Sequence, residues 1–258
     1  MSSRRHLFLE EMGLTPVWRL RGQDSGVGIQ DSESGIQDSG FGMQENGVDN
    51  ALVLTAPEQA PDRAAAIARM NWGELKTAVV DCKACPLSKT RHQTVFGVGD
   101  EMADWLFIGE APGAEEDARG EPFVGQAGRL LDNMLAAIGL KRGDNVYIAN
   151  VLKCRPPGNR NPEPFEVAQC NPHLLRQLEL IQPKLIVALG RFAAQTLLDT
   201  DATIASLRGR IHRFQGVPTI VTYHPAYLLR NLPDKAKAWA DLCLARKTMG
   251  DLTRRAVH

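Results

Sequence analysis

The stretch KLIVALG, residues 184–190, sets the fold class, because it is a short apolar run that ends on glycine and leads at once into a helical pattern over residues 191–198. Similar apolar runs occur at residues 105–109, 145–150 and 217–223. Since helical patterns lie between these runs, strands alternate with helices, which is typical of a parallel sheet covered on both faces. We therefore predict a three-layer αβα fold of the α/β class, with a central, mostly parallel sheet of four strands.

The segments between the predicted strands carry their apolar side chains on one helical face. Within residues 128–138 this face consists of Leu131, Met134, Leu135 and Ile138. The same periodicity predicts helices near residues 72–80, 174–181 and 235–248.

Polar residues follow three of the four predicted strands. The residues at or just after the strand ends are Glu110, Asn150, Gly190 and His224. In open parallel sheets, ligands bind off the carboxyl ends of the strands. Glu110, Asn150 and His224 carry side chains suited to contact a small heterocycle, so the sequence predicts a binding site at this edge of the sheet.

The composition is that of an ordinary soluble globular protein, with 43% hydrophobic and 23% charged residues among 258. No apolar run approaches the ~20 residues that a membrane-spanning helix needs. The first residues, MSSRRHLFLEE, carry two arginines but only a short apolar stub and no small-residue cleavage site. We therefore expect a cytoplasmic protein without a signal peptide and without a membrane association.

The net charge of zero hides an uneven distribution. Residues 1–50 hold 4 Lys/Arg against 8 Asp/Glu, whereas residues 151–258 hold 16 Lys/Arg against 8 Asp/Glu. A basic carboxyl-terminal half is compatible with a polyanion lying across one edge of the fold, although solvated arginines explain the same excess.

The first 70 residues differ in character from the rest of the chain. Residues 22–50 are rich in Gly, Ser, Asp and Gln, and the tetrapeptide IQDS occurs twice in them, so this stretch has too little apolar surface to offset the entropy of ordering. The apolar and basic block before it is either a peptide that docks on a partner protein or a segment that folds back on the domain. The predicted organisation is a short N-terminal segment and possible docking peptide at 1–21, a disordered linker at 22–70, the domain at 71–250 and a tail at 251–258.

Four cysteines, Cys82, Cys85, Cys154 and Cys170, form the most informative group of the chain. Cys82 and Cys85 have the spacing of a metal-binding thiolate pair, and a reducing compartment favours a metal site over disulfides. Four thiolates suit either structural zinc or a [4Fe–4S] cluster. The wide separation of Cys154 and Cys170 favours the cluster, and Cys243 in the last predicted helix is expected to be a bystander.

Four motifs, taken with these cysteines, closely resemble the iron–sulfur (family 4) uracil-DNA glycosylases. The motifs are GEAPGAEED at residues 109–117, GEPFVG at 120–125, NVLKCRPP at 150–157 and HPAYLLR at 224–230. The resemblance covers roughly residues 73–248. It implies a uracil-DNA glycosylase-like fold, a [4Fe–4S] cluster held by the four cysteines, and a monomeric DNA-repair enzyme. Its implied substrate is uracil in single- or double-stranded DNA, so we also expect association with the nucleoid.

Excision of uracil breaks an N-glycosidic bond through a sugar with oxocarbenium character and a departing uracil anion, so the enzyme needs a donor, a stacking surface and a reader of the base edge. By the resemblance, His224 donates to uracil O2, Phe123 stacks on the base, and the amide of Asn150 reads the O4/N3 edge. Each residue also has an ordinary structural interpretation: a histidine in a turn, a core phenylalanine and a strand-ending asparagine. The motifs favour the functional interpretation.

The first motif contributes four further residues to the expected pocket. A related glycosylase branch carries an aspartate at the position of Ala111, where it orients the attacking water. Either Glu110 takes over this task here, or stabilisation of the leaving base carries most of the barrier reduction. Glu116 resembles the residue that fills the space beside uracil C5, where thymine has its methyl group, and Gly109 is expected to contact the base together with Ala111.

The segment after His224 is expected to contact DNA. A flipped nucleotide leaves a gap that an apolar side chain can fill, and Leu228 or Leu229 is the candidate wedge. Arg230 is expected to neutralise a flanking phosphate, together with Arg208, Arg210 and Arg213. A core position is the alternative for both leucines, and we expect it for one of them.

Two other functions remain open from the sequence. One is a non-catalytic iron–sulfur module that binds nucleic acid and is tethered to replication or repair machinery, although such a module has no need of a uracil pocket. The other is a relative that traps uracil covalently, which carries a basic insert with a histidine after the second strand. Residues 155–162 read RPPGNRNP and contain no histidine, which argues against this relative.

Overall fold

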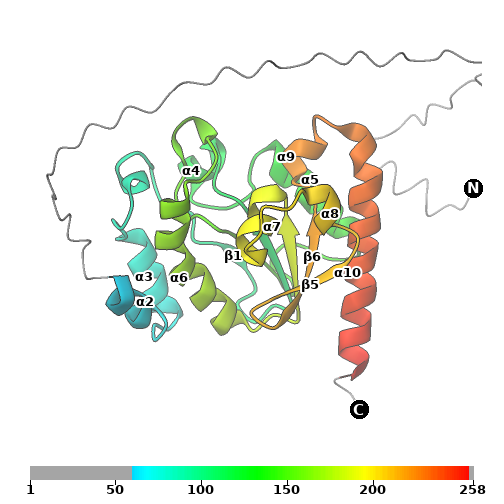
Figure 1. The fold of residues 1–258 in the computed structure, drawn as a ribbon, viewed down its shortest axis with the longest axis horizontal. Helices are drawn as coiled ribbons and strands as arrows, with labels where there is room; N and C mark the ends of the chain where they lie inside the picture. The colour runs from blue at the N-terminus through cyan, green and yellow to red at the C-terminus, as the bar shows by residue number, and fades with distance from the viewer. Residues whose placement is uncertain (1–59, 256–258) are drawn as a thin grey trace, which may run out of the picture.

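A six-stranded sheet with the order β1-β3-β2-β4-β6-β5 lies at the centre of the computed structural model (Figure 1). Its four inner strands run parallel, as predicted: β2 (Trp105–Gly109), β3 (Val146–Asn150), β4 (Leu185–Leu189) and β6 (Val217–Thr222). All residues of β2, β3 and β4 are buried, which explains why each reads as a continuous apolar run.

The predicted number of four strands is too low, because a short antiparallel strand pairs with each edge of the parallel sheet. β1 (Val98–Gly99) pairs with β3, and β5 (Ile211–Phe214) pairs with β6. β1 has only two residues, and β5 has the sequence IHRF with its last residue alone buried. Neither strand therefore produces an apolar run that the sequence pattern reveals.

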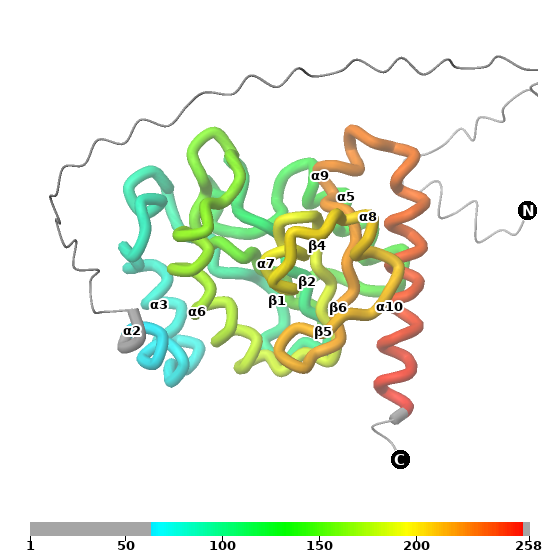
Figure 2. Tube along the Cα trace, viewed as in Figure 1, coloured from blue at the N-terminus to red at the C-terminus, as the bar shows by residue number. Residues whose placement is uncertain are grey.

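Helices cover both faces of the sheet, which confirms the three layers. On one face, Trp105 and Phe107 of β2 share a core with α5 (Gln126–Ala137) and α10 (Lys235–Arg255). On the other face, Leu106 and Ile108 share a core with α3, α6 and α7. These helices span Trp72–Val80, Pro164–Ile181 and Arg191–Leu198. Figure 2 shows α10 at one side of the molecule and α2, α3 and α6 at the other.

The structure describes residues 60–255, so the proposed docking peptide at 1–21 and most of the predicted linker lie outside the described residues. Two predicted boundaries need correction. Helix α2 (Ala60–Ile67) falls inside the predicted linker, and α10 continues to Arg255, beyond the predicted domain end at 250. None of the helices in the described part of the chain combines the length and the apolar character that a membrane span requires.

Short helices close the connections at the carboxyl edge of the sheet and beside α3. They are η1 (Pro86–Lys89), α4 (Ala114–Arg119), η2 (Pro157–Asn159), α8 (Ile204–Leu207), α9 (Pro225–Leu228) and η3 (Leu232–Asp234). Several of them begin at proline, whose fixed φ suits the first helical position.

The strand order places a crevice between β2 and β4. The chain passes from β2 to β3 on one side and then returns to β4 on the other side of β2, so the connections leave the sheet in opposite directions at this point. Ligands of open α/β sheets bind at such a switch point, beyond the carboxyl ends of the strands. Glu110 follows β2 and Gly190 follows β4, so both residues flank this crevice.

Candidate active site

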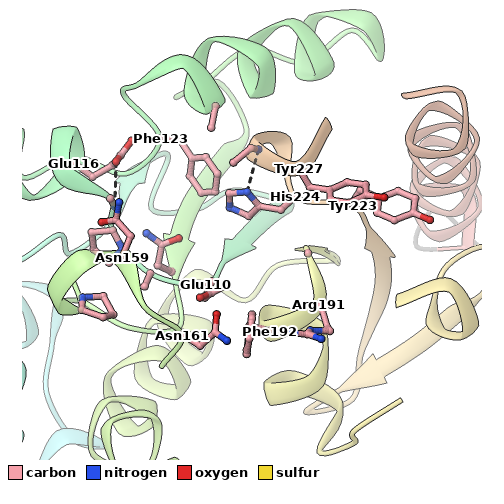
Figure 3. Close-up of a pocket in the computed structure, with 18 of the residues that line it drawn as sticks. Glu110, Glu116, Phe123, Asn159, Asn161, Arg191, Phe192, Tyr223, His224 and Tyr227 are labelled. Carbon is pink, nitrogen blue, oxygen red and sulfur yellow. Dashed lines mark hydrogen bonds between the residues drawn. The ribbon is translucent and has the colours of Figure 1, made fainter. Parts of the chain in front are cut away.

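A cavity of about 780 Å³ opens at the carboxyl ends of the parallel strands (Figure 3). Eight of the residues that the sequence singles out line it: Glu110, Ala111, Glu116, Phe123, Asn150, Gly190, His224 and Arg230. They come from four separate segments of the chain, which the sheet brings together.

His224 follows β6 and is the N-cap residue of α9. Its Nδ1 accepts a hydrogen bond from the main-chain N–H of Ala226 at 3.1 Å, so the ring proton lies on Nε2. Burial lowers the pKa of His224 to about 4, against a smaller opposing effect of Glu116. At neutral pH this side chain is therefore a neutral imidazole that offers an Nε2–H donor.

Gly190 makes room for this histidine. Its φ is 91°, in the left-handed region that favours glycine, and a Cβ at this position would lie 2.7 Å from Cβ of His224. The end of β4 therefore approaches His224 more closely than any other residue type allows.

Phe123 is held beside His224 by its own main chain. The two ring centroids are 5.4 Å apart with the planes tilted by 31° (Figure 3). Phe123 has a φ of 56°, which is rare for a bulky residue, and its carbonyl accepts a hydrogen bond from Arg142 at 2.8 Å. Arg142 also donates to the carbonyl of Pro122 at 2.9 Å and pairs with Asp132 at 2.9 Å. This clamp keeps the ring at the wall of the cavity.

Two glycines leave space for the Phe123 segment. A Cβ on Gly128 would lie 1.8 Å from the carbonyl oxygen of Phe123. A Cβ on Gly109 would lie 2.6 Å from Cζ of Phe123 and 2.4 Å from Oδ1 of Asn150. Gly109, which was expected to contact the base, thus lies behind the cavity wall, where its missing side chain lets Phe123 and Asn150 pack.

Asn150 ends β3 and is paired in register with Gly109 of β2. The residue is only 2% exposed, and its Oδ1 has no hydrogen-bond partner. Buried acceptors without a partner are rare, because they cost about 1–3 kcal/mol. An amide oxygen left unpaired at the wall of a cavity indicates a ligand that donates a hydrogen bond to it.

Glu116 lines the cavity, but its carboxylate is bound by the main chain of the rim. Oε2 accepts from the N–H of Gly113 at 3.1 Å, and Oε1 accepts from Val124 at 3.0 Å and from Gly125 at 3.2 Å. These contacts tie α4 to the segment that carries Phe123. Glu116 therefore shapes the rim of the cavity as well as lining it.

Glu110 and two residues that the sequence pattern did not reveal lie along another wall. Burial raises the pKa of Glu110 to about 7, and the guanidinium of Arg191 acts in the opposite direction. Arg191 and Phe192 begin α7 directly after β4 and line the cavity (Figure 3). The rule that selected Gly190 as a strand end would have found both residues if it had been extended by two positions.

The loop after β3 contributes Pro156, Asn159, Arg160 and Asn161 to the cavity, none of which was selected from the sequence. The remaining unselected lining residues include Tyr223 and Tyr227, whose rings stack with centroids 5.1 Å apart. No periodicity marks such loop positions, so only their proximity to the motifs could have suggested them.

The structure separates the residues that were expected to contact DNA. Leu228 is completely buried, so its selection as a DNA-contacting residue is corrected, whereas Leu229 is 39% exposed and Arg230 is exposed at the cavity mouth. Arg208 also departs from the expected role, because it pairs with buried Asp241 at 2.9 Å and lies over the Tyr223 ring. Its guanidinium therefore stabilises the fold.

The four cysteines selected as metal ligands line a second, smaller cavity between α3, the loop after β3 and α6. Three of the sulfur atoms accept hydrogen bonds: Cys154 from Arg91 at 2.9 Å, Cys170 from the main chain of Lys153 at 3.2 Å, and Cys82 from Arg63 at 3.5 Å. Donors around a set of sulfurs suit thiolates that bind an electron-poor centre. Cys243 lies apart from them on α10.

Three thiols of this site do not ionise readily by themselves. Burial raises the pKa of Cys170 to about 12 and also raises those of Cys154 and Cys85. All cysteines in the described part of the chain are free, so no disulfide explains their grouping. Among the described residues, no three His, Cys, Asp or Glu side chains are close enough to hold one metal ion.

Comparison with known proteins adds to this geometry. The model of the "Uracil DNA glycosylase superfamily" matches residues 96–243. A type-4 uracil-DNA glycosylase of Archaeoglobus fulgidus is 52% identical over 159 residues, which span 58% of this chain and 79% of that protein. The type-4 enzyme of Thermotoga maritima is 48% identical over 59% of this chain and 80% of its own length. A type-5 enzyme of Pyrobaculum aerophilum is 35% identical over 61% and 83%.

Proposed function

The chain belongs to the uracil DNA glycosylase superfamily and resembles its type-4 members most closely among these relatives, and we propose that it flips uracil out of DNA and hydrolyses its N-glycosidic bond. The product is free uracil and an abasic site in DNA. The observation that carries this proposal is the unpaired Oδ1 of Asn150, which lies in the same cavity as the Nε2–H donor of His224.

Uracil matches the polar groups of this cavity. Its N3–H can donate to Oδ1 of Asn150, and its O4 can accept from the side-chain NH₂ of the same amide. Cytosine presents a donor at C4 and an acceptor at N3, so a fixed amide orientation excludes it. Phe123 supplies the stacking surface for the flipped base.

His224 supplies the electrostatic stabilisation. As the glycosidic bond breaks, the sugar gains oxocarbenium character and negative charge develops on uracil O2 and its neighbouring atoms. A neutral imidazole that donates from Nε2 stabilises this charge without giving up its proton, and its low pKa keeps it in the neutral form. The hydrogen bond from Ala226 to Nδ1 holds the ring in this orientation.

Glu110 is proposed to orient the water that attacks the sugar. Glu110 directly precedes Ala111, the position at which the related branch carries its water-orienting aspartate. The carboxyl of Glu110 lines the cavity and could take over that task. Because its pKa is about 7, a substantial fraction is ionised at neutral pH. The ionised form can also stabilise the positive charge on the sugar.

Glu116 is proposed to exclude thymine. Its carboxylate holds the rim beside Phe123, where it restricts the space available to a methyl group at C5. On the outer side of the mouth, Leu229 is proposed as the wedge that fills the gap left by the flipped nucleotide, and Arg230 as a phosphate ligand.

A [4Fe–4S] cluster is proposed to be held by Cys82, Cys85, Cys154 and Cys170. All four cysteines line one cavity, and hydrogen bonds from the protein reach three of their sulfurs, which suits thiolates bound to an electron-poor centre. The wide separation of Cys154 and Cys170 in the sequence favours the cluster over a zinc site built from two close cysteine pairs. When bound, the cluster would cross-link the loop after β3 to α3 and α6 and could accept or donate an electron.

The proposal is tested with labelled single- and double-stranded oligonucleotides that contain one uracil. Free uracil and an alkali-sensitive abasic site are expected from both, and matched oligonucleotides with thymine or cytosine should remain intact. Tight binding without base release would overturn the proposal and support the non-catalytic binding module. A panel with hypoxanthine and xanthine would then define the range of deaminated bases.

A covalent adduct between the protein and uracil-containing DNA would support the uracil-trapping relative instead. The loop after β3 lines the cavity with Asn159 and Asn161 and offers no histidine, which favours hydrolysis. Denaturing gel electrophoresis of the reaction mixture distinguishes the two outcomes.

A further inference from the structure

A single buried lysine connects the cavity to the cysteine site. Lys153 lies between Asn150 and Cys154 in the sequence and is only 1% exposed. Its Nζ donates to the main-chain carbonyl of Asn150 at 2.8 Å and to Oε1 of Gln177 at 2.6 Å. The ammonium group is thus aimed back at the residue that ends β3.

The main chain of Lys153 is fixed at the same time. Its N–H donates to Sγ of Cys170 at 3.2 Å, and its carbonyl accepts from the N–H of Val95 at 2.8 Å. One residue therefore contacts a proposed cluster ligand through its backbone and the proposed base reader through its side chain.

Gln177 is positioned to support this contact. Its Nε2 donates to the carbonyl of Phe96 at 2.9 Å and to the hydroxyl of Tyr147 at 3.4 Å, which turns Oε1 towards Lys153. Neither acceptor of the lysine is a carboxylate, so the ammonium is buried without a formal counter-ion in these two contacts. Burying a charge in this way is unfavourable unless its donors are well paired.

The need for this support arises at Asn150. The side-chain Oδ1 of Asn150 has no partner of its own in the protein, so no bond to that oxygen fixes the amide before a base arrives. The position of the amide then depends on its main chain, whose carbonyl is held by the lysine. An error of about 1 Å at a binding group is enough to weaken recognition strongly.

We propose that Lys153 is a positioning residue, which fixes the main chain of Asn150 against the cysteine site and thereby sets the preference of the cavity for uracil. This inference rests on the proposed function. It assigns to the loop between the cysteines and β3 a part in base recognition, in addition to its part in the fold.

The test compares wild type with Lys153→Met, which keeps a long side chain but removes both donor contacts. Binding is measured to duplexes that carry 2′-fluoro-2′-deoxyuridine or its cytidine counterpart, because the fluorine destabilises the oxocarbenium ion and blocks cleavage. We expect the ratio of the two affinities to fall about 10-fold, in line with the loss of hydrogen bonds to a charged group. A ratio within twofold of wild type would overturn the proposal.

A double-mutant cycle with Asn150→Ala distinguishes an effect of Lys153 on the position of Asn150 from a general destabilisation of the fold. If Lys153 acts through Asn150, Lys153→Met should change the affinity ratio little once Asn150 is alanine. An equal, independent loss in that background would contradict the proposal. Leu178→Ala is the control for stability: Leu178 is 5% exposed on the same helix as Gln177, and its loss should lower the melting temperature without changing the ratio.

Folding of the variant is checked by its melting curve and iron content. If Lys153→Met does not fold, Gln177→Met removes one of the two acceptors and should lower the affinity ratio in the same direction, and an unchanged ratio would overturn the proposal. Failure of the proposed function can be distinguished from failure of this inference, because the wild-type protein would then release no uracil. Failure of this inference alone leaves uracil release intact and the ratio unaffected by the substitutions.

Discussion

The main-chain N–H of Ala226 lies 3.1 Å from Nδ1 of His224 and donates a hydrogen bond to it, which assigns the ring proton of the histidine to Nε2. The proline at the first position of α9 sets the turn that makes this contact possible. The donor that faces the cavity is therefore fixed by the backbone of the very next turn.

Replacement of His224 by alanine should lower the single-turnover rate of uracil release by ~10²–10³, because one preorganised donor to a developing anion is lost. Affinity for uracil-containing DNA should stay within a few-fold. His212→Ala is a suitable control, since that ring bonds to the carbonyl of Leu207 and does not line the cavity. A near-normal rate in His224→Ala would remove the residue from its assigned role.

The pH dependence of the single-turnover rate should follow Glu110. Its carboxyl has a pKa of about 7, so the ionised form is lost as the pH falls through 7, and the rate should decline with it. His224, with a pKa of about 4, stays neutral over this range and should add no step near pH 6.5. Glu110→Gln should abolish the decline, and a decline that persists in this variant would assign it to another group.

The pKa shifts of His224 and Glu110 make the free energy of unfolding depend on pH in opposite directions. The depressed pKa of His224 contributes stability that is present above pH 6.5 and is lost as the pH falls towards 4. The raised pKa of Glu110 contributes stability that is fully present below about pH 4.5 and is lost as the pH rises through 7. Urea unfolding of His224→Ala and Glu110→Gln between pH 4 and pH 8 separates these contributions.

Anaerobically purified protein should be brown, with broad absorbance near ~400 nm from sulfur-to-iron charge transfer at a four-cysteine cluster. Cys85→Ala and Cys154→Ala should bleach this absorbance and lower the iron content, whereas Cys243→Ser should leave both unchanged. Metal analysis that returns one zinc and no iron would overturn the assignment.

Leu228, the last residue of α9, and Leu229, which follows it, should respond differently to replacement by alanine. Leu228 is fully buried, so Leu228→Ala should lower the free energy of unfolding by ~2–5 kcal/mol. Leu229 is exposed, so Leu229→Ala should leave stability nearly unchanged but slow excision from duplex more than from single strands. An unchanged ratio of the two rates would show that Leu229 does not open the helix.

The parallel core and the main site residues could be predicted from sequence because both depend on local patterns. β2, β3 and β4 are buried along their whole length and therefore appear as apolar runs, and the strand-end rule leads directly to Glu110, Asn150 and His224. The edge strands and the lining residues Asn159 and Asn161 carry no such pattern. Their positions depend on contacts between distant segments.

The sequence also did not determine which side chains of a segment are buried. HPAYLLR places two leucines next to each other, and only the direction in which α9 packs on the core decides that Leu228 faces inwards. Helix α2 was assigned to the linker, as a frayed helix at most, for a related reason: its Ala-rich segment has little apolar character, and contacts such as that of Arg63 with the carbonyl of Gln169 at 2.9 Å help to hold it.

The clamp on Phe123 has a thermodynamic consequence for base capture. Immobilising a flexible side chain on binding costs about 0.5–1.5 kcal/mol in conformational entropy. Since Arg142 and the close approach of Gly128 already restrict the Phe123 segment in the free protein, this cost is met during folding and does not recur with each flipped base. Calorimetry should therefore find a larger entropic penalty for base binding when Arg142 is replaced and the segment is released.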